Sequence, residues 1–210
     1  MTNNTYFRPF NFRPIVAESK LRATHRTAYA SYCYIRREPD IDMYGPMPQE
    51  WGTRCDLVAT GRISPAQTPA WARSGPKIWK DADASVFPHC LNEAAASHVV
   101  LTLPPSEDTT SWEHLIKKFG TEHLADYGMI ADWAIHHKPD EIAPHAHLII
   151  TARSWRTDRA PGRRHPRWLA NPEAVRTATL AWIDISGMRP IASFPELLLG
   201  TNMDRSRRTL

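Results

Sequence analysis

The sequence has few cysteines and no long apolar run. Its 210 residues include only three cysteines, Cys33, Cys55 and Cys90, and their spacing matches no zinc or redox motif. This pattern predicts reduced thiols and therefore a cytoplasmic protein. No apolar stretch approaches the roughly 20 residues of a transmembrane helix, and the first residues lack the apolar segment of a signal peptide. We therefore expect no membrane partner.

Neither sign of charge dominates, because the formal net charge is only +4. This mildly basic balance permits a phosphate-rich partner but does not require one. The 18 prolines predict many loops and interrupted elements. The length suits one domain over residues 1–210, with a long loop at 39–70, an arginine-rich loop at 154–170 and a disordered tail at 200–210.

Apolar patterning predicts a mixed α/β domain. The β-branched run His98–Pro104 indicates a buried strand that a proline ends. Two further apolar runs, Met129–His136 and His145–Arg153, are separated by a proline-containing linker and indicate an antiparallel pair joined by a loop. A first strand is expected over residues 6–16, and helices are expected over residues 19–38, 70–96 and 172–185 and after a cap at Thr110 or Ser111.

Three histidines give the strongest chemical signal. His145 and His147 lie two residues apart and share one face of the expected strand. His136 ends the preceding strand, so antiparallel pairing would bring it within about 5 Å of them at Cβ. Three neutral imidazoles leave other positions of a divalent ion open, as catalysis needs; the alternative is a merely polar, exposed strand face. Asp132 shares the face of His136 and could orient an imidazole, or be an exposed carboxylate.

Three tyrosines, Tyr29, Tyr32 and Tyr34, lie on one expected helix. Tyr29 and Tyr32 form a stripe with Ala28 and Cys33 that is typical of a core face, whereas Tyr34 lies off that stripe. Tyrosine has a pKa of about 10, so a nucleophilic tyrosine needs a nearby cation or base and a metal that polarises the phosphate. Periodicity alone does not show whether a tyrosine and the histidines meet.

The segment GMIADWAIHHKPDEIAPHAHLIITAR resembles the signature of MobA/MobL-type (MobQ class) plasmid mobilisation relaxases, which belong to the HUH endonucleases. The matching positions are Ala134, Ile135, His136, Pro144, His145, His147 and Arg153. The resemblance implies that His136, His145 and His147 are the metal ligands. It also implies an α+β fold in which helices pack on a central antiparallel β-sheet as a two-layer sandwich.

Two upstream segments add to this resemblance. TAYASYCYIRRE is similar to the relaxase helix that carries the nucleophile and implies Tyr34 in that role. Another form of the family motif favours Tyr29, and Tyr32 is the third choice. PAWARSGPKIWKDAD resembles a segment whose acidic residue falls at Asp83, where the family usually has Glu. Asp83 is therefore a second candidate for supporting the metal ligands.

The resemblance implies a site- and strand-specific DNA nicking and rejoining enzyme for plasmid mobilisation. Its tyrosine attacks a DNA phosphate and forms a 5′-phosphotyrosine. The implied cofactor is a divalent metal, with Mg²⁺ or Mn²⁺ expected and Zn²⁺ compatible with three imidazoles. The implied partners are single-stranded DNA at an origin of transfer, with or without an adjacent hairpin, and accessory mobilisation proteins.

The arginine-rich segment near residue 160 is a candidate DNA contact. Arginines pair with phosphates and an indole can stack on a base, although a solvated basic loop would have the same composition. The candidate residues are Arg153, Arg156, Arg163, Arg164, Arg167 and Trp155.

Three other functions remain open at this stage. Another HUH enzyme, such as a replication initiator or transposase, would use the same chemistry at another DNA site. A three-histidine metallohydrolase would use a metal-bound water and no tyrosine. A non-catalytic DNA-binding relic would keep the fold and bind DNA without nicking it.

Overall fold

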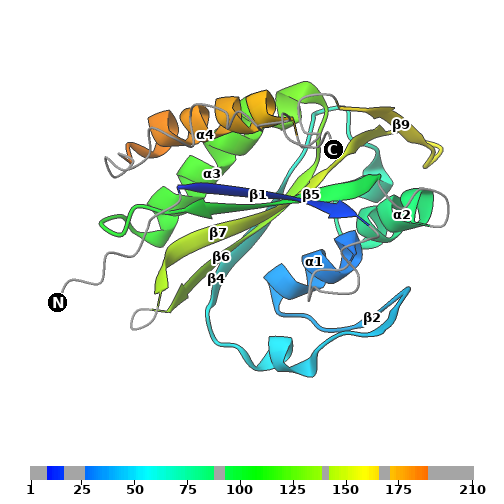
Figure 1. Ribbon diagram of the computed structural model, residues 1–210, viewed down its shortest axis with the longest axis horizontal. Helices are drawn as coiled ribbons and strands as arrows, with labels where there is room; N and C mark the ends of the chain where they lie inside the picture. Colours follow the sequence, from blue (N-terminus) through cyan, green and yellow to red (C-terminus); the bar gives the residue numbers. More distant parts are fainter. Residues whose placement is uncertain (1–8, 17–26, 88–92, 139–141, 166–170, 189–210) are drawn as a thin grey trace, which may run out of the picture.

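The computed structural model describes residues 9–16, 27–87, 93–138, 142–165 and 171–188. Its centre is a five-stranded sheet with the strand order β1-β5-β7-β6-β4, and every neighbouring pair is antiparallel (Figure 1). The expected α+β class with a central antiparallel sheet is therefore confirmed. The strands are β1 (Phe10–Val16), β4 (Leu57–Ile63), β5 (Ala94–Thr102), β6 (Ala131–Lys138) and β7 (Ile142–Thr151).

Helices cover both faces of this sheet (Figure 1). Alternate strand residues point to opposite faces, so β7 sends Ile149 into one core and Leu148 and Ile150 into the other. The first core includes residues of α1 and α2, and the second includes residues of α3 and α4. The chain thus has three layers, not the two expected. The helices are α1 (Ala28–Arg36), α2 (Lys77–Val86), α3 (Thr109–His123) and α4 (Pro172–Ser186).

The segment expected as a long loop at 39–70 contains the edge strand β4 of the main sheet. In its sequence, LVATGRI, apolar and polar residues do not alternate strictly, which makes the strand signal weak. Most of these residues are half-buried in the structure, so neither face of the strand is purely apolar. The same segment holds the small hairpin of β2 (Ile41–Asp42) and β3 (Gly45–Pro46) and the 3₁₀ helix η2 (Gln49–Thr53).

The arginine-rich segment expected as a loop is a hairpin of β8 (Arg153–Trp155) and β9 (Pro161–Arg164). The expected helix over 70–96 is also wrong in extent, because it divides into η3 (Ala70–Ala72), α2 and the first residues of β5. Small residues at 94–97 fit a helix by propensity, but they are buried in the sheet between β1 and β7.

The tyrosine-bearing helix α1 is shorter than the expected range of 19–38. Thr27 caps it, because its hydroxyl accepts a hydrogen bond from the amide of Ala30. The helix ends at Arg37, whose backbone is left-handed with φ of 59°. Residues 19–26 of the expected helix and the expected tail at 200–210 lie outside the described residues.

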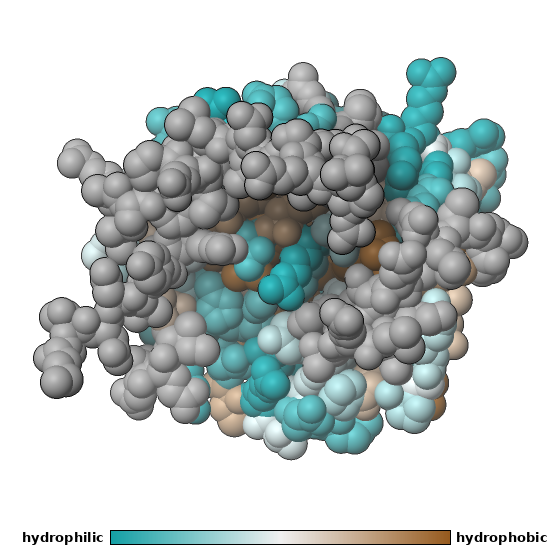
Figure 2. Space-filling model, viewed as in Figure 1, coloured by the Kyte–Doolittle hydropathy of each residue, from teal (hydrophilic) through white to brown (hydrophobic). Residues whose placement is uncertain are grey.

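The surface agrees with the composition of the chain. On the face seen in Figure 2, much of the visible described surface is hydrophilic, and apolar colour shows near its centre. Among the described residues, no helix combines the length and apolarity needed to cross a bilayer.

Candidate metal centre and active site

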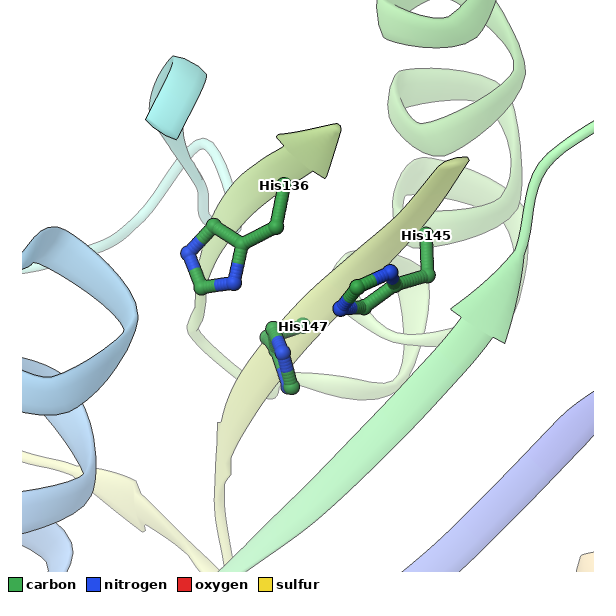
Figure 3. A group of neighbouring side chains, drawn as sticks. All are labelled: His136, His145 and His147. Atoms are coloured by element: carbon green, nitrogen blue, oxygen red, sulfur yellow. The ribbon is translucent and has the colours of Figure 1, made fainter. Parts of the chain in front are cut away.

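The β6–β7 hairpin brings the three predicted histidines together (Figure 3). His136 pairs directly with His145 across the two strands, and His147 follows two residues later on the same face. One ligand nitrogen from each of the three lies within 4.8 Å of the other two. The ring centroids of His136 and His147 are 4.6 Å apart, and those of His145 and His147 are 4.9 Å apart. The cluster could therefore hold a metal ion.

Protonation favours this use of the histidines. Burial is the main cause that lowers the pKa of His136 to about 4, and the nearby Arg37 guanidinium contributes to the same shift. Burial also lowers the pKa of His145. His145 donates from Nδ1 to the carbonyl of Ala143 at 3.1 Å, which leaves its Nε2 with a lone pair. Neutral imidazoles bind metals without first losing a proton, so the donor set fits a divalent cation.

His98 supports the cluster from the neighbouring strand β5. Its Nε2 lies 2.9 Å from Nδ1 of His147, and both side chains are buried. If Nε2 of His147 held a metal ion, its Nδ1 would carry the hydrogen and donate a hydrogen bond to Nε2 of His98. The only sequence signal for His98 is a histidine at the start of an apolar strand, and that signal does not show which side chain it meets.

Arg37 and Asp56 form a second set of contacts beside the cluster that the sequence did not indicate. The guanidinium of Arg37 makes two hydrogen bonds to the carboxylate of Asp56, at 2.8 and 2.7 Å. The Nη2 of Arg37 also lies 3.0 Å from Nδ1 of His136. The other nitrogen of His136, Nε2, is 2.8 Å from the carbonyl oxygen of Ile35 on α1. These contacts connect the tyrosine helix, the histidine strand and residue 56.

The two carboxylates expected to support the histidines have other partners. Asp132 accepts hydrogen bonds from the guanidinium of Arg62 and from the indole of Trp79. It lies four residues before His136, which is about 13 Å along a strand. Asp83 accepts the amides of Ala28 and Tyr29 at the start of α1. Burial raises the pKa of Asp83 to about 7. The expectation that Asp132 or Asp83 orients an imidazole is thus corrected.

Tyr34 lies beside the histidine cluster. Its ring centroid is 5.6 Å from that of His147 and 6.3 Å from that of His136, with edge-to-face geometry in both cases. Trp51 packs against the same ring at 5.3 Å. The α1 face that carries Tyr34 therefore faces the sheet surface that carries the histidines.

Tyr29 and Tyr32 belong to the core beneath α1. Their rings stack with centroids 6.4 Å apart, and both are buried. Tyr29 donates its hydroxyl proton to Asp40. Burial raises the pKa of Tyr29 and of Tyr32, so each phenolate is harder to form. Their places agree with the core stripe seen in the sequence.

The arginine-rich hairpin lies away from the histidines. Arg153 follows the end of β7, about 25 Å along the chain from His145 near its start. Arg153 and Arg164 both pair with Glu93. The remaining candidates are placed as follows: Arg156 pairs with Asp158, Trp155 packs against Trp71, Arg163 is exposed, and Arg167 lies outside the described residues. The ion pairs tie this hairpin to the start of β5, and its contact with DNA stays a prediction.

Known proteins resemble the chain in sequence and in fold. It is 31% identical over 104 residues to "Probable conjugal transfer protein TraA" of Sinorhizobium fredii, a match that covers 46% of this chain and 9% of that protein. It is 28% identical over 107 residues to "Conjugal transfer protein TraA" of Agrobacterium fabrum, with the same coverage of 46% and 9%. The chain thus corresponds to a small part of these relatives.

A solved structure described as "Molecular Basis of Vancomycin Resistance Transfer in Staphylococcus aureus" shares the fold, with a TM-score of 0.67 and 19% identity. The superposition covers 84% of this chain and 89% of the other. The model of the MobA/MobL family matches residues 26–180. This range includes α1, every strand of the main sheet apart from β1, and the three histidines. The chain therefore belongs to the MobA/MobL family.

Proposed function

We propose that this chain nicks and rejoins one strand of DNA at an origin of transfer, with Tyr34 as the nucleophile. The observation that carries the proposal is the position of the Tyr34 ring, 5.6 Å from that of His147 and within the same cluster of rings as His136. Family membership supports the reaction class, and the curated relatives named for conjugal transfer support the biological setting.

The proposed reaction exchanges one phosphodiester for another. The Oη of Tyr34 forms a bond to the DNA phosphorus as the bond from phosphorus to the 3′ oxygen breaks. The tyrosine proton leaves to solvent, and the departing oxygen takes up a proton as a free 3′-OH. The product is a 5′-phosphotyrosine of similar energy, so the strand can be rejoined without ATP. A divalent ion held by the three histidines would supply positive charge for the phosphate oxygens, with Mg²⁺ or Mn²⁺ expected.

Two arginines bring further positive charge to Tyr34. The guanidinium carbon of Arg37 lies 4.6 Å from the centroid of the Tyr34 ring, and that of Arg54 lies 5.7 Å from it. Arg54 is exposed, so an incoming strand can reach it. A guanidinium binds two oxygens of a phosphate in a planar fork. We assign Arg54 the role of holding the scissile phosphate in line with Tyr34.

A covalent-adduct assay tests the proposal. The protein is incubated with Mn²⁺ and labelled single strands that carry candidate origin sequences, and the products are separated on a denaturing gel. The wild type and Tyr32→Phe should form a protein–DNA adduct, and Tyr34→Phe should not. Tyr32→Phe is the matched control because it removes a hydroxyl from the same helix but from its core side.

The other outcomes identify other functions. An adduct that persists in Tyr34→Phe and disappears in Tyr29→Phe would move the nucleophile to Tyr29. Cleavage without any adduct would indicate a metallohydrolase. Binding without cleavage across a library of origins would indicate a non-catalytic DNA-binding protein. Adducts with replication or transposon ends in place of transfer origins would indicate a different HUH enzyme.

A further inference from the structure

Arg37 occupies a backbone position that ordinarily belongs to glycine. It follows the last turn of α1 with φ of 59°, and its amide closes that turn by donating to the carbonyls of Cys33 and Tyr34. A left-handed residue after a helix is usually glycine, because a Cβ is strained there. An arginine in this strained position indicates that its side chain has a role at the site.

The side chain of Arg37 is buried, with 5% exposure, and every branch of it is used. Nε and Nη2 bind the carboxylate of Asp56, and Nη1 donates to the carbonyl oxygen of Tyr34 at 3.0 Å. The second hydrogen of Nη2 is directed to Nδ1 of His136 at 3.0 Å. The fork to Asp56 fixes the guanidinium in place, so it does not turn away from His136.

These contacts fix the tautomer of His136. A guanidinium can only donate, so Nδ1 of His136 accepts and carries no hydrogen. The Nε2 of His136 then carries the hydrogen and donates it to the carbonyl oxygen of Ile35 at 2.8 Å. Figure 3 shows one ring nitrogen of His136 directed toward the other two histidines and the other directed toward α1. The lone pair that faces the cluster is therefore already bonded to Arg37.

We propose that Arg37 competes with the metal ion for Nδ1 of His136, and that a phosphate oxygen relieves this competition. A cation that binds this nitrogen must displace an N–H of Arg37. The displaced N–H is buried beside Tyr34, and a buried charged donor without an acceptor is unfavourable. A DNA phosphate at Tyr34 supplies the acceptor. Metal and phosphate then strengthen each other's binding, and by linkage the factor is the same in both directions.

Isothermal titration of the protein with Mn²⁺ alone tests the competition. Arg37→Gly removes the guanidinium and suits the left-handed backbone, so the helix end is preserved. We expect it to bind Mn²⁺ at least about tenfold more tightly than the wild type, because one charged hydrogen bond no longer has to be broken. Arg36→Gln, the matched control on the same turn, should bind like the wild type, because Arg36 pairs with the exposed Glu38. Equal or weaker binding by Arg37→Gly would overturn the proposal.

Two further variants remove the main ambiguities. Loss of Arg37 releases the carboxylate of Asp56, which could itself bind Mn²⁺. The double variant Arg37→Gly/Asp56→Asn should therefore keep the tighter binding, and a return to wild-type affinity would show that the gain came from the carboxylate. If Arg37→Gly does not fold, Arg37→Lys serves instead, because an ammonium does not reproduce the fork that joins Asp56 to His136.

The phosphate half rests on the proposed function and has its own readout. The Mn²⁺ titration is repeated with a short oligothymidylate in a Tyr34→Phe background, where cleavage plays no part. The oligonucleotide should tighten Mn²⁺ binding about tenfold when Arg37 is present and should have little effect in the Arg37→Gly variant. An equal effect in both would refute the coupling. Failure of nicking alone would leave the metal titrations unaffected, so the two proposals fail separately.

Discussion

The hydrogen bond between His98 and His147 gives a prediction about metal affinity. His98→Ala removes the acceptor that lies 2.9 Å from Nδ1 of His147. The two residues are only 8% and 7% exposed, so water does not readily replace the lost partner. A buried donor left without an acceptor costs about 1–3 kcal/mol, and loss of a group that orients a metal ligand typically lowers metal affinity about 10–100-fold. We expect a loss of that size in Mn²⁺ titrations, while urea unfolding of the metal-free protein reports any structural cost separately.

Matched variants make this prediction specific. His137→Ala removes the adjacent histidine of β6, which packs against Trp112 on the opposite face of the sheet, and should leave Mn²⁺ affinity unchanged. His98→Gln restores an acceptor and should recover part of the affinity. If His98→Ala binds Mn²⁺ as tightly as the wild type, or if His98→Gln is as weak as His98→Ala, then His98 does not act by orienting His147.

Three more predictions concern packing, pH and metal. Gly61→Ala places a Cβ 2.4 Å from Cζ2 of the buried Trp133, and should lower the free energy of unfolding by about 1–3 kcal/mol; unchanged urea unfolding would show that the indole moves freely. Burial raises the pKa of Asp83 to about 7, above the value of about 3.9 for an unfolded aspartate. The unfolded chain thus binds fewer protons than the folded chain between these values, so this group makes stability fall as pH rises from about 4 to about 7. Asp83→Asn should remove that part of the slope of unfolding free energy against pH, and identical slopes would contradict it. Finally, dialysis against a chelator should abolish the covalent DNA adduct and added Mn²⁺ should restore it, whereas an adduct that persists would mean that the reaction needs no metal.

The histidine cluster was the most predictable part of the site because it is local. His145 and His147 share a face by the two-residue period of a strand, and His136 is connected to them through one short hairpin. The register then needs only one correct strand pairing. The position of Tyr34 was harder to predict. Helical periodicity separated it from the core stripe of Tyr29 and Tyr32, but it did not show that Tyr34 packs beside the histidines of the sheet.

The supports of the site were missed because they depend on long-range contacts. Asp56 reaches Arg37 only because β4 is the edge strand of the sheet and pairs with β6. This pairing sets Asp56 opposite the end of β6, where the carbonyl oxygen of Asp56 accepts a hydrogen bond from the amide of His137. The sequence indicated a loop there. His98 reaches His147 only through the pairing of β5 with β7, which joins residues about fifty positions apart.

Long-range contacts also explain why the sequence overestimated the free positive charge of the arginine-rich hairpin. The composition of this hairpin indicated a phosphate-binding loop. In the structure, Arg153 pairs with Glu93 and Arg159 pairs with Asp81, and both acids come from distant parts of the sequence. A count of arginines in one segment includes charges that the fold has already neutralised. Two cations, Arg37 and Arg54, border Tyr34, and both lie outside the arginine-rich segment. The charge available around Tyr34 is therefore set by which acidic groups the fold brings to each arginine. One buried guanidinium beside the three histidines can matter more there than a basic loop.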